Sequence, residues 1–290
     1  MLGFLNIDKP AAITSRDAVN RIQRIVRPSK VGHAGTLDPL ATGVLVVALG
    51  GATRLVDYVH RFPKTYEAAF LLGRQSDTED ITGQVMETPA ARVPGLEELQ
   101  AAMRQLVGQT MQRPPAYSAL KVQGERAYDL ARRGESVALN ARPIRVHEIE
   151  LLRYDYPELQ LRIKCGTGTY VRSLGRDLAE SVGTHAVMSQ LRRTAIGVFH
   201  LCDAVPLETI GNTTLPANLQ PPECIFDKSE MELLSVMEQV RIMQGQWIER
   251  ASHGRQSHVA ALDQDGKLLA LLVPLDANRL RPVLTLRHER

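Results

Sequence analysis

The chain has 290 residues, 44% hydrophobic and 23% charged, a composition typical of a folded globular protein with one large or two modest domains. No apolar run reaches the roughly 18 residues of a membrane span, and the first residues lack the basic start of a signal peptide, so we expect a cytoplasmic protein without a membrane anchor. Three cysteines without CxxC spacing argue against a disulfide framework and against a four-cysteine zinc site.

The positive charge is uneven both by residue type and along the chain. The 35 cations are 28 arginines and seven lysines, and the planar guanidinium of arginine matches phosphate groups, although a GC-rich genome produces the same bias. Residues 1–64 carry nine cations and four anions, residues 65–112 carry three and seven, and residues 113–145 carry seven and three. Two basic blocks separated by an acidic one predict a charged face that suits a large anionic partner.

The first predicted elements are a strand over 3–7 and a helix over 15–27. Apolar residues at helical spacing indicate the helix, a hydroxyl at Thr14 or Ser15 can cap it, and Pro28 ends it. Its arginines fall mostly off the apolar face, where a solvated surface explains them as well as a bound ligand does.

Strands and helices then alternate irregularly through the middle of the chain. A glycine-rich loop over 32–43 leads into Val44–Leu49, an apolar run typical of a buried strand. Alternating or helical spacing of apolar residues predicts strands over 64–72, 144–152 and 159–165, and helices over 96–107 and 169–182. This mixed order favours an α+β fold over a regular βαβ repeat.

The last third of the chain changes in composition. Proline, asparagine and threonine become frequent and periodicity is lost, which is typical of a linker. Short apolar segments follow, two of them around an Asp265-Gly266 turn of hairpin type. We therefore predict a main domain over 1–210, a linker over 211–230, and a small β-rich domain over 231–290.

The common motifs of cofactor and metal enzymes are missing from the sequence. There is no GxxxxGK[ST] phosphate loop, no complete GxGxxG fingerprint, no GxSxG elbow and no HExxH pair. We therefore expect neither a cofactor nor a metal.

The loop over 32–43 is the strongest chemical signal. It carries three glycines and one acid, Asp38, and the following Pro39 biases the backbone of Asp38 toward extended geometry. An ordinary Asp-Pro turn explains these residues as well, and one carboxylate without a second does not define a reaction.

The run from Val31 to Leu45 resembles the TruB family of pseudouridine synthases, which act on position 55 of tRNA. Further blocks occur in the family's order, namely Asn6–Pro10 with Thr14-Ser15, Lys64–Tyr66, Arg113–Lys121, Gly168–Leu174 and Leu191–Thr194. The resemblance implies a catalytic domain built on a mixed, largely antiparallel sheet with flanking helices. It also implies a small C-terminal RNA-binding domain of the PUA type.

The resemblance assigns the chemistry to three residues. Asp38 matches the catalytic aspartate that acts on the ribose of the target uridine, and Arg172 matches the arginine that pairs with it. Tyr66 matches the tyrosine that stacks on the target base and helps to remove its C5 proton. Without the resemblance, Tyr66 is explained as a strand core residue and Arg172 as a surface helix residue.

Other residues are assigned to RNA binding by the same resemblance. His33, Tyr170 and Leu191 match residues that hold the flipped nucleotide or line its pocket, and Lys9 belongs to the substrate-binding set, whereas Leu191 alone would be ordinary core. In the family, residues 113–145 form an insertion that grips the T-arm. The cations expected to meet RNA phosphates there are Arg126, Arg132, Arg133 and Arg142.

The chain departs from the family pattern at Ala12, where glycine is usual. Because alanine adopts a positive φ only at a cost, we expect this loop to be shaped differently here.

The resemblance implies an isomerase that converts the T-loop uridine of tRNA to pseudouridine, acting as a monomer without a cofactor or a protein partner. Two alternatives stay open: a synthase directed by a guide RNA, and a non-catalytic RNA-folding protein, which the basic blocks alone would satisfy.

Overall fold

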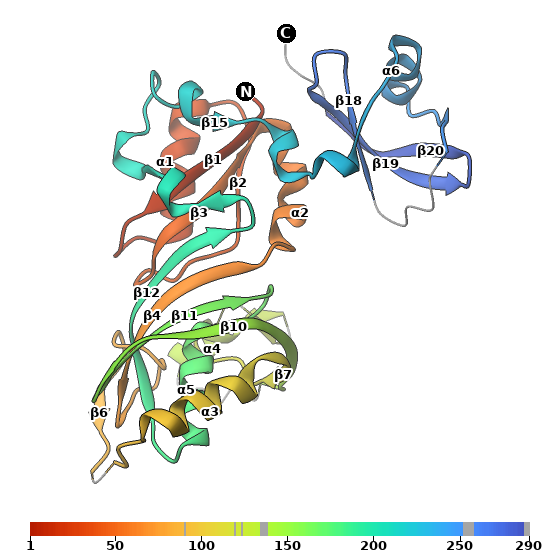
Figure 1. Ribbon diagram of the computed structural model, residues 1–290. Coiled ribbons are helices and arrows are strands. Elements are labelled where there is room, and N and C mark those ends of the chain that lie inside the picture. Colours follow the sequence, from red (N-terminus) through yellow and green to blue (C-terminus); the bar gives the residue numbers. More distant parts are fainter. Residues whose placement is uncertain (90, 119, 123, 134–138, 252–257, 287–290) are drawn as a thin grey trace.

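The structure is a computed structural model that describes residues 1–290 except 90, 119, 123, 134–138, 252–257 and 287–290. A mixed sheet of eleven strands runs through the body in the order β14-β1-β3-β12-β4-β11-β10-β7, and three more strands pair along it (Figure 1). Its strands are β1 (Gly3–Lys9), β2 (Val31–Ala34), β3 (Thr42–Leu49), β4 (Lys64–Leu72), β7 (Gly108–Gln112), β10 (Arg142–Asp155), β11 (Glu158–Cys165), β12 (Ala186–Ile196), β13 (Phe199–His200), β14 (Val205–Pro206) and β15 (Leu219–Gln220).

The described residues also form six α-helices and two short hairpins. The helices are α1 (Ser15–Val26), α2 (Val56–His60), α3 (Leu96–Leu106), α4 (Ala127–Arg132), α5 (Val171–Ser181) and α6 (Val236–Met243). The hairpins pair β5 (Arg74–Gln75) with β6 (Met86–Glu87) and β8 (Lys121–Val122) with β9 (Glu125–Arg126). No helix in the described ranges is long and apolar enough to cross a membrane.

Strand β12 joins the two halves of the large sheet. It pairs in parallel with β3 on one side and antiparallel with β4 on the other. The close approach to β3 depends on Gly43, which has φ +98°, because a Cβ there would lie 2.2 Å from the carbonyl oxygen of Arg193. This strand was not predicted from the sequence, and it brings the residues of β3, β4 and β12 together at one place.

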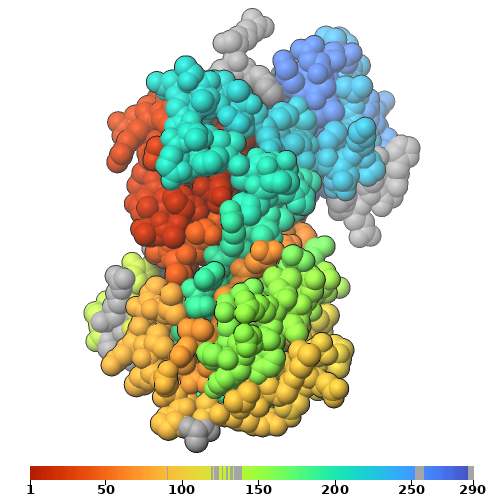
Figure 2. Space-filling model, turned by 60° about the vertical axis from the view of Figure 1, so that its left-hand side comes forward, coloured from red at the N-terminus to blue at the C-terminus, as the bar shows by residue number. Residues whose placement is uncertain are grey.

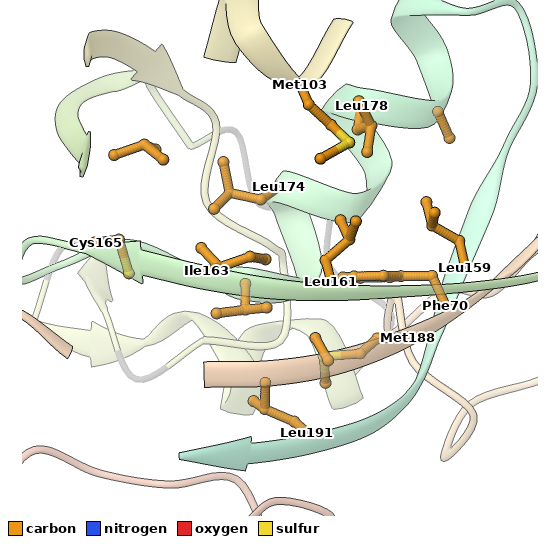
Figure 3. Close-up of a cluster of buried hydrophobic side chains, with 14 of the residues drawn as sticks. Phe70, Met103, Leu159, Leu161, Ile163, Cys165, Leu174, Leu178, Met188 and Leu191 are labelled. Atoms are coloured by element: carbon orange, nitrogen blue, oxygen red, sulfur yellow. The ribbon is translucent and has the colours of Figure 1, made fainter. Parts of the chain in front are cut away.

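Each half of the sheet has its own helical cover. Helix α1 packs on the half that contains β1 and β3, and a capping box between Thr14 and Asp17 fixes its start. Helices α3 and α5 cover the half that contains β4, β10 and β11, where Met103, Leu174 and Leu178 meet the sheet (Figure 3). Helix α5 comes close because Gly175 faces Phe70, where a Cβ would lie 2.1 Å from the ring.

The predicted α+β class and the strands and helices of the first 182 residues are confirmed, with ends within a few residues. Two differences concern the same region. Strand β2 (Val31–Ala34) includes residues 32–34, which were predicted as part of a glycine-rich loop, and it forms because it pairs with the buried strand β3. The segment after the β3 strand, which carried no prediction, forms helix α2.

The C-terminal residues form a small β-rich unit, as predicted, with a helix that was not. Its sheet has the order β16-β18-β19-β20-β17, with strands β16 (Met231–Leu233), β17 (Ile248–Glu249), β18 (Val259–Leu262), β19 (Leu268–Asp276) and β20 (Arg279–Thr285). Helix α6 begins at a capping box of Ser235 and Glu238. In Figure 2 this unit, in blue, lies beside the cyan residues of the predicted linker, at the end of the body that also holds the N-terminal residues in red.

The predicted linker is packed against the body. Within 211–230, strand β15 pairs with β1, and Leu215 and Ile225 are buried. Leu268 and Leu271 of the C-terminal unit join one apolar cluster with residues of β3. The exact domain boundaries stay a prediction, but residues 211–230 do not act as a free connector.

Candidate active site

A pocket of about 280 Å³ opens where the two halves of the sheet meet. Its walls come mainly from the loop after β2, the start of β4, the second half of β12 and the segment that leads into α5, which are distant from one another in sequence. Six of the residues predicted for the site line it, namely Asp38, Tyr66, Arg142, Tyr170, Arg172 and Leu191. Its volume lies near the lower end of small-molecule sites, which span roughly 300–1,000 Å³.

Asp38 is paired with Arg172 at this pocket, as the resemblance implied. The Asp38 Oδ2 atom lies 3.0 Å from Arg172 Nη2, and 40% of the Asp38 side chain stays exposed, whereas Arg172 is buried. Arg172 Nη1 lies 3.4 Å from the buried carboxylate of Asp80 and donates to the carbonyl oxygen of Thr78 at 2.8 Å. These contacts hold one side of the Arg172 guanidinium, and its other side faces Asp38.

The loop that carries Asp38 is fixed by its neighbours in space. The Ser15 hydroxyl, at the start of α1, accepts a hydrogen bond from the backbone N–H of Leu37 at 2.8 Å and donates to its carbonyl oxygen at 3.2 Å. On the other side, the N–H of Ala12 donates to the carbonyl oxygen of Pro39 at 2.9 Å. Both residues that flank Asp38 are thus anchored, which holds the carboxylate toward the pocket.

Ala12 adopts a φ of +65°, the left-handed conformation that alanine takes only at a cost, while a different loop shape from that of the family stays a prediction. A left-handed alanine costs roughly 1–2 kcal/mol. We therefore expect Ala12→Gly to raise the free energy of unfolding by up to about 1 kcal/mol, after the entropy that glycine gains in the unfolded chain is subtracted.

The measurement is urea denaturation of both proteins. The matched control is Ala11→Gly, because Ala11 has no positive φ and should lose stability or stay unchanged. A stabilisation of equal size in both variants would contradict the role given to the Ala12 backbone.

Tyr66 forms the aromatic wall of the pocket. It lies on β4 opposite Arg193 of β12, whose guanidinium carbon is 6.0 Å from the ring centroid. Burial raises the pKa of the Tyr66 phenol, and the opposing effect of Arg193 is smaller. The ring is therefore neutral near pH 7, and it lines the pocket.

Tyr170 is held by two polar side chains. The Gln112 side chain accepts from the Tyr170 N–H at 2.9 Å and donates to the Tyr170 carbonyl oxygen at 3.0 Å. Arg142 lies over the Tyr170 ring at 5.1 Å and donates to the carbonyl oxygen of Gly168 at 2.6 Å. Arg142 was predicted to bind the RNA backbone, and the structure places it in the pocket wall, where it supports Tyr170.

Lys9 and His33 do not line the pocket. Lys9 is fully buried, and its ammonium donates to the carbonyl oxygens of Pro10 at 2.7 Å and Ile13 at 2.8 Å. Burial lowers the pKa of Lys9 to about 8, against the opposing effect of Asp38. The surroundings of Lys9 indicate that it shapes the loop before α1, whereas its predicted contact with substrate stays a prediction.

His33 lies on β2 with its Nδ1 atom buried and without a hydrogen-bond partner among the described residues. Burial lowers its pKa to about 4, and Arg16 and Arg193 add to the effect. At a pH between the ordinary and the lowered pKa, His33 therefore binds a proton in the unfolded state but not in the folded state. Stability should fall as the pH drops from about 6.5 toward 4.

We expect His33→Asn to reduce this loss, measured as the change in urea midpoint between pH 7 and pH 5. His147→Asn, at an exposed position on β10, is the control and should keep the wild-type pH dependence. An unchanged pH dependence in His33→Asn would overturn the assignment.

The insertion over 113–145 is described in part. The side chains of Arg126 and Arg132 lie outside the described residues, so their predicted phosphate contacts stay a prediction. Arg133 is exposed, and its Nη2 lies 2.6 Å from a carboxylate oxygen of Glu125. The base of the insertion is tied to the site, since the carbonyl oxygen of Tyr117 accepts from Arg172 at 3.0 Å.

Most of the charged side chains that line the pocket are positive. Ser118, buried in its wall, has a hydroxyl without a hydrogen-bond partner among the described residues. Among the described residues that line the pocket, the charged ones are four cations, Lys64, Arg142, Arg172 and Arg193, and one carboxylate, Asp38. Such a pocket suits an anionic ligand with hydrogen-bonding groups. Within the described ranges, no three His, Cys, Asp or Glu side chains gather closely enough to hold a metal ion.

Three residues of the site were not singled out from the sequence: Lys64, Asp80 and Arg193. All three are charged and almost fully buried, and charged residues are expected on the surface unless a partner is known. Lys64 and Arg193 stood inside family blocks, which was the available signal. Nothing in the sequence indicated Asp80, because its partner Arg172 is 92 residues away.

Comparison with known proteins identifies the family. Residues 23–171 match the model of the TruB family pseudouridylate synthase N-terminal domain, and residues 172–223 match that of the tRNA pseudouridylate synthase B C-terminal domain. The tRNA pseudouridine synthase B of Mycobacterium tuberculosis is 39% identical over 98% of this chain and 96% of its own length. That of Acaryochloris marina is 44% identical over 78% of this chain and 79% of its own length.

Among solved structures, a chain of a Cbf5-Nop10-Gar1 complex superposes with a TM-score of 0.71 at 25% identity. The match covers 99% of this chain and 84% of that one.

Proposed function

The chain belongs to the TruB family of pseudouridylate synthases, and from this premise we propose that it converts the uridine at position 55, in the T-loop of tRNA, to pseudouridine with Asp38 as the catalytic carboxylate. The family makes it a tRNA pseudouridine synthase, which is an isomerase. The target nucleotide and the residue that acts on it are the parts proposed.

One observation carries the assignment of Asp38. It is the only carboxylate among the described residues that line the pocket, and it meets a buried arginine while keeping an exposed face. A carboxylate is a group that can attack carbon or accept a proton, and the exposed face of Asp38 is open to the pocket.

The geometry of the pocket supports base flipping. A uridine inside a folded T-loop must leave its stack before a protein group can reach its glycosidic bond. The Tyr66 ring offers an aromatic face that replaces part of the lost stacking, and Leu191 supplies an apolar contact beside it. Tyr170 closes the wall near the start of α5.

The reaction replaces the N1–C1′ bond between uracil and ribose with a C5–C1′ bond. The N1–C1′ bond breaks, Asp38 acts on the ribose, the uracil rotates, and C5 bonds to C1′. Direct attack at C1′ and removal of a 2′ proton both use this carboxylate. No step needs a cofactor, because the product is an isomer of the substrate.

The expected substrate is the T-arm of tRNA, bound by a monomer in the cytoplasm without a protein partner. Arginines of the basic insertion would meet the phosphates of the arm, while the pocket takes the single flipped nucleotide.

A guide-directed reaction is the second candidate, because the structural relative named above is part of a complex with Nop10 and Gar1. The two are separated by a T-arm transcript labelled with tritium at C5 of uridine, incubated with the purified chain alone. We expect stoichiometric tritium release without guide or partner. Release only after addition of a guide RNA would favour the second candidate, and binding without release would favour a non-catalytic protein.

A further inference from the structure

Two buried cations stand beside the aromatic wall of the pocket without a carboxylate to balance them. Lys64 and Arg193 both line the pocket, and their exposed fractions are 5% and 1%. Among the described residues, no carboxylate oxygen lies within 4.0 Å of either side chain. A buried charge without a counterion is costly, so a further role is expected for one that is kept.

The strand geometry places both cations next to the position of a stacked base. Lys64 and Tyr66 are two residues apart on β4, so their side chains leave the same face of the sheet. Arg193 pairs with Tyr66 across β12 and β4, and its guanidinium lies over the ring. A base stacked on Tyr66 would therefore lie next to both charges.

Backbone contacts alone do not explain these charges. The Lys64 ammonium donates to the carbonyl oxygen of His60, and Arg193 donates to the carbonyl oxygens of Val44 at 2.7 Å and Gly35 at 3.0 Å. Neutral donors could make these contacts with less desolvation. Burial and Arg193 lower the pKa of Lys64 to about 8, as expected for an ammonium near another cation and without a bound anion.

The proposed reaction generates an anion at this place. When the N1–C1′ bond breaks, its electron pair stays with the uracil and spreads over N1 and the carbonyl oxygens. The deficient C1′ bonds to Asp38, or Asp38 takes the C2′ proton. After rotation, C5 supplies the electron pair of the new C5–C1′ bond while the Asp38–C1′ bond breaks, or while Asp38 returns its proton to C2′. The C5 proton is then lost to solvent, and N1 gains a proton.

We propose that Lys64 and Arg193 stabilise the negative charge that develops on the uracil as its glycosidic bond breaks. The inference rests on the proposed function and adds two catalytic residues to it. Charges fixed in advance in a dry pocket lower the energy of a developing anion more than mobile solvent does.

The test compares two substrates that differ in how well the base carries negative charge. T-arm RNA with uridine at the target position is compared with the same RNA containing 4-thiouridine, because sulfur spreads the charge better and the departing base then needs less help. Under single-turnover conditions, we expect Lys64→Met to slow C5 proton release from uridine by about 100-fold. The loss on 4-thiouridine should be about tenfold smaller, and RNA affinity should stay unchanged.

Two further variants separate charge from structure. Lys64→Gln keeps an N–H donor for His60 without the charge, so it should resemble Lys64→Met, and it replaces that variant if Lys64→Met does not fold. Lys9→Met removes the other buried lysine, which has the same lowered pKa but does not line the pocket. In Lys9→Met, the ratio of the rates on uridine and on 4-thiouridine should stay the same as in the wild type.

Equal losses on both substrates in Lys64→Met and Lys64→Gln would overturn the inference while leaving the proposed function intact. Absence of pseudouridine with the wild-type enzyme would instead reject the proposed function.

Discussion

Asp38→Asn is expected to lower the rate of pseudouridine formation by about 10⁴-fold or more, with little change in RNA binding. Asparagine has the size of aspartate and can still accept a hydrogen bond from Arg172, but its amide neither attacks carbon nor accepts a proton at neutral pH. Arg172 also keeps its second carboxylate, Asp80, so the fold should be retained. The rate is measured in single turnover and the affinity by filter binding.

The matched control for this prediction is Asp57→Asn. Asp57 lies on α2, close in sequence to the pocket residue His60, and its side chain is 87% exposed. It should keep wild-type activity. Activity of Asp38→Asn within about tenfold of the wild type would show that the carboxylate is not the reacting group.

Arg172→Met is expected to impair both activity and stability. It leaves the buried Asp80 without its cation, and removal of one partner from a buried ion pair costs about 3–5 kcal/mol of unfolding free energy. It also frees the carboxylate of Asp38 to turn, which we expect to lower the rate by about 10²–10³-fold.

Arg162→Met is a close control, because Arg162 also bridges two carboxylates. Its guanidinium lies 3.0 Å from Glu67 and 2.7 Å from Glu150, but all three side chains are more than 40% exposed. Such surface pairs contribute about 0–1 kcal/mol each. Equal loss of stability in both variants, measured by urea denaturation, would contradict the special position of Arg172.

The regular elements were predictable where apolar residues repeat with a clear period. Helices α1, α3 and α5 each bury one apolar stripe, and in β4 the apolar residues Tyr66, Ala68, Phe70 and Leu72 recur at every second position. Strand β12 lacks this pattern, because it carries consecutive arginines and its pairing with β4 shifts register twice. Its position at the centre of the sheet comes from long-range pairing that local periodicity does not encode.

The site was predictable only through the family resemblance. A sequence pattern does not tell that Asp38 and Arg172 meet, since the contact requires the loop after β2 to approach the start of α5. The buried charges were harder still, because Lys64, Asp80 and Arg193 are polar residues with core positions. Lys9 is the opposite case: it stands in a family block, but its hydrogen bonds hold the loop before α1 and it does not line the pocket.

The most direct test of the central claim is the mapping of pseudouridine, at single-nucleotide resolution, in an unmodified tRNA transcript treated with the purified protein alone. Wild-type protein should place pseudouridine at position 55 and at no other uridine, and Asp38→Asn should place none. Pseudouridine at another position, or at position 55 with both proteins, would contradict the assignment of the T-loop uridine or of Asp38.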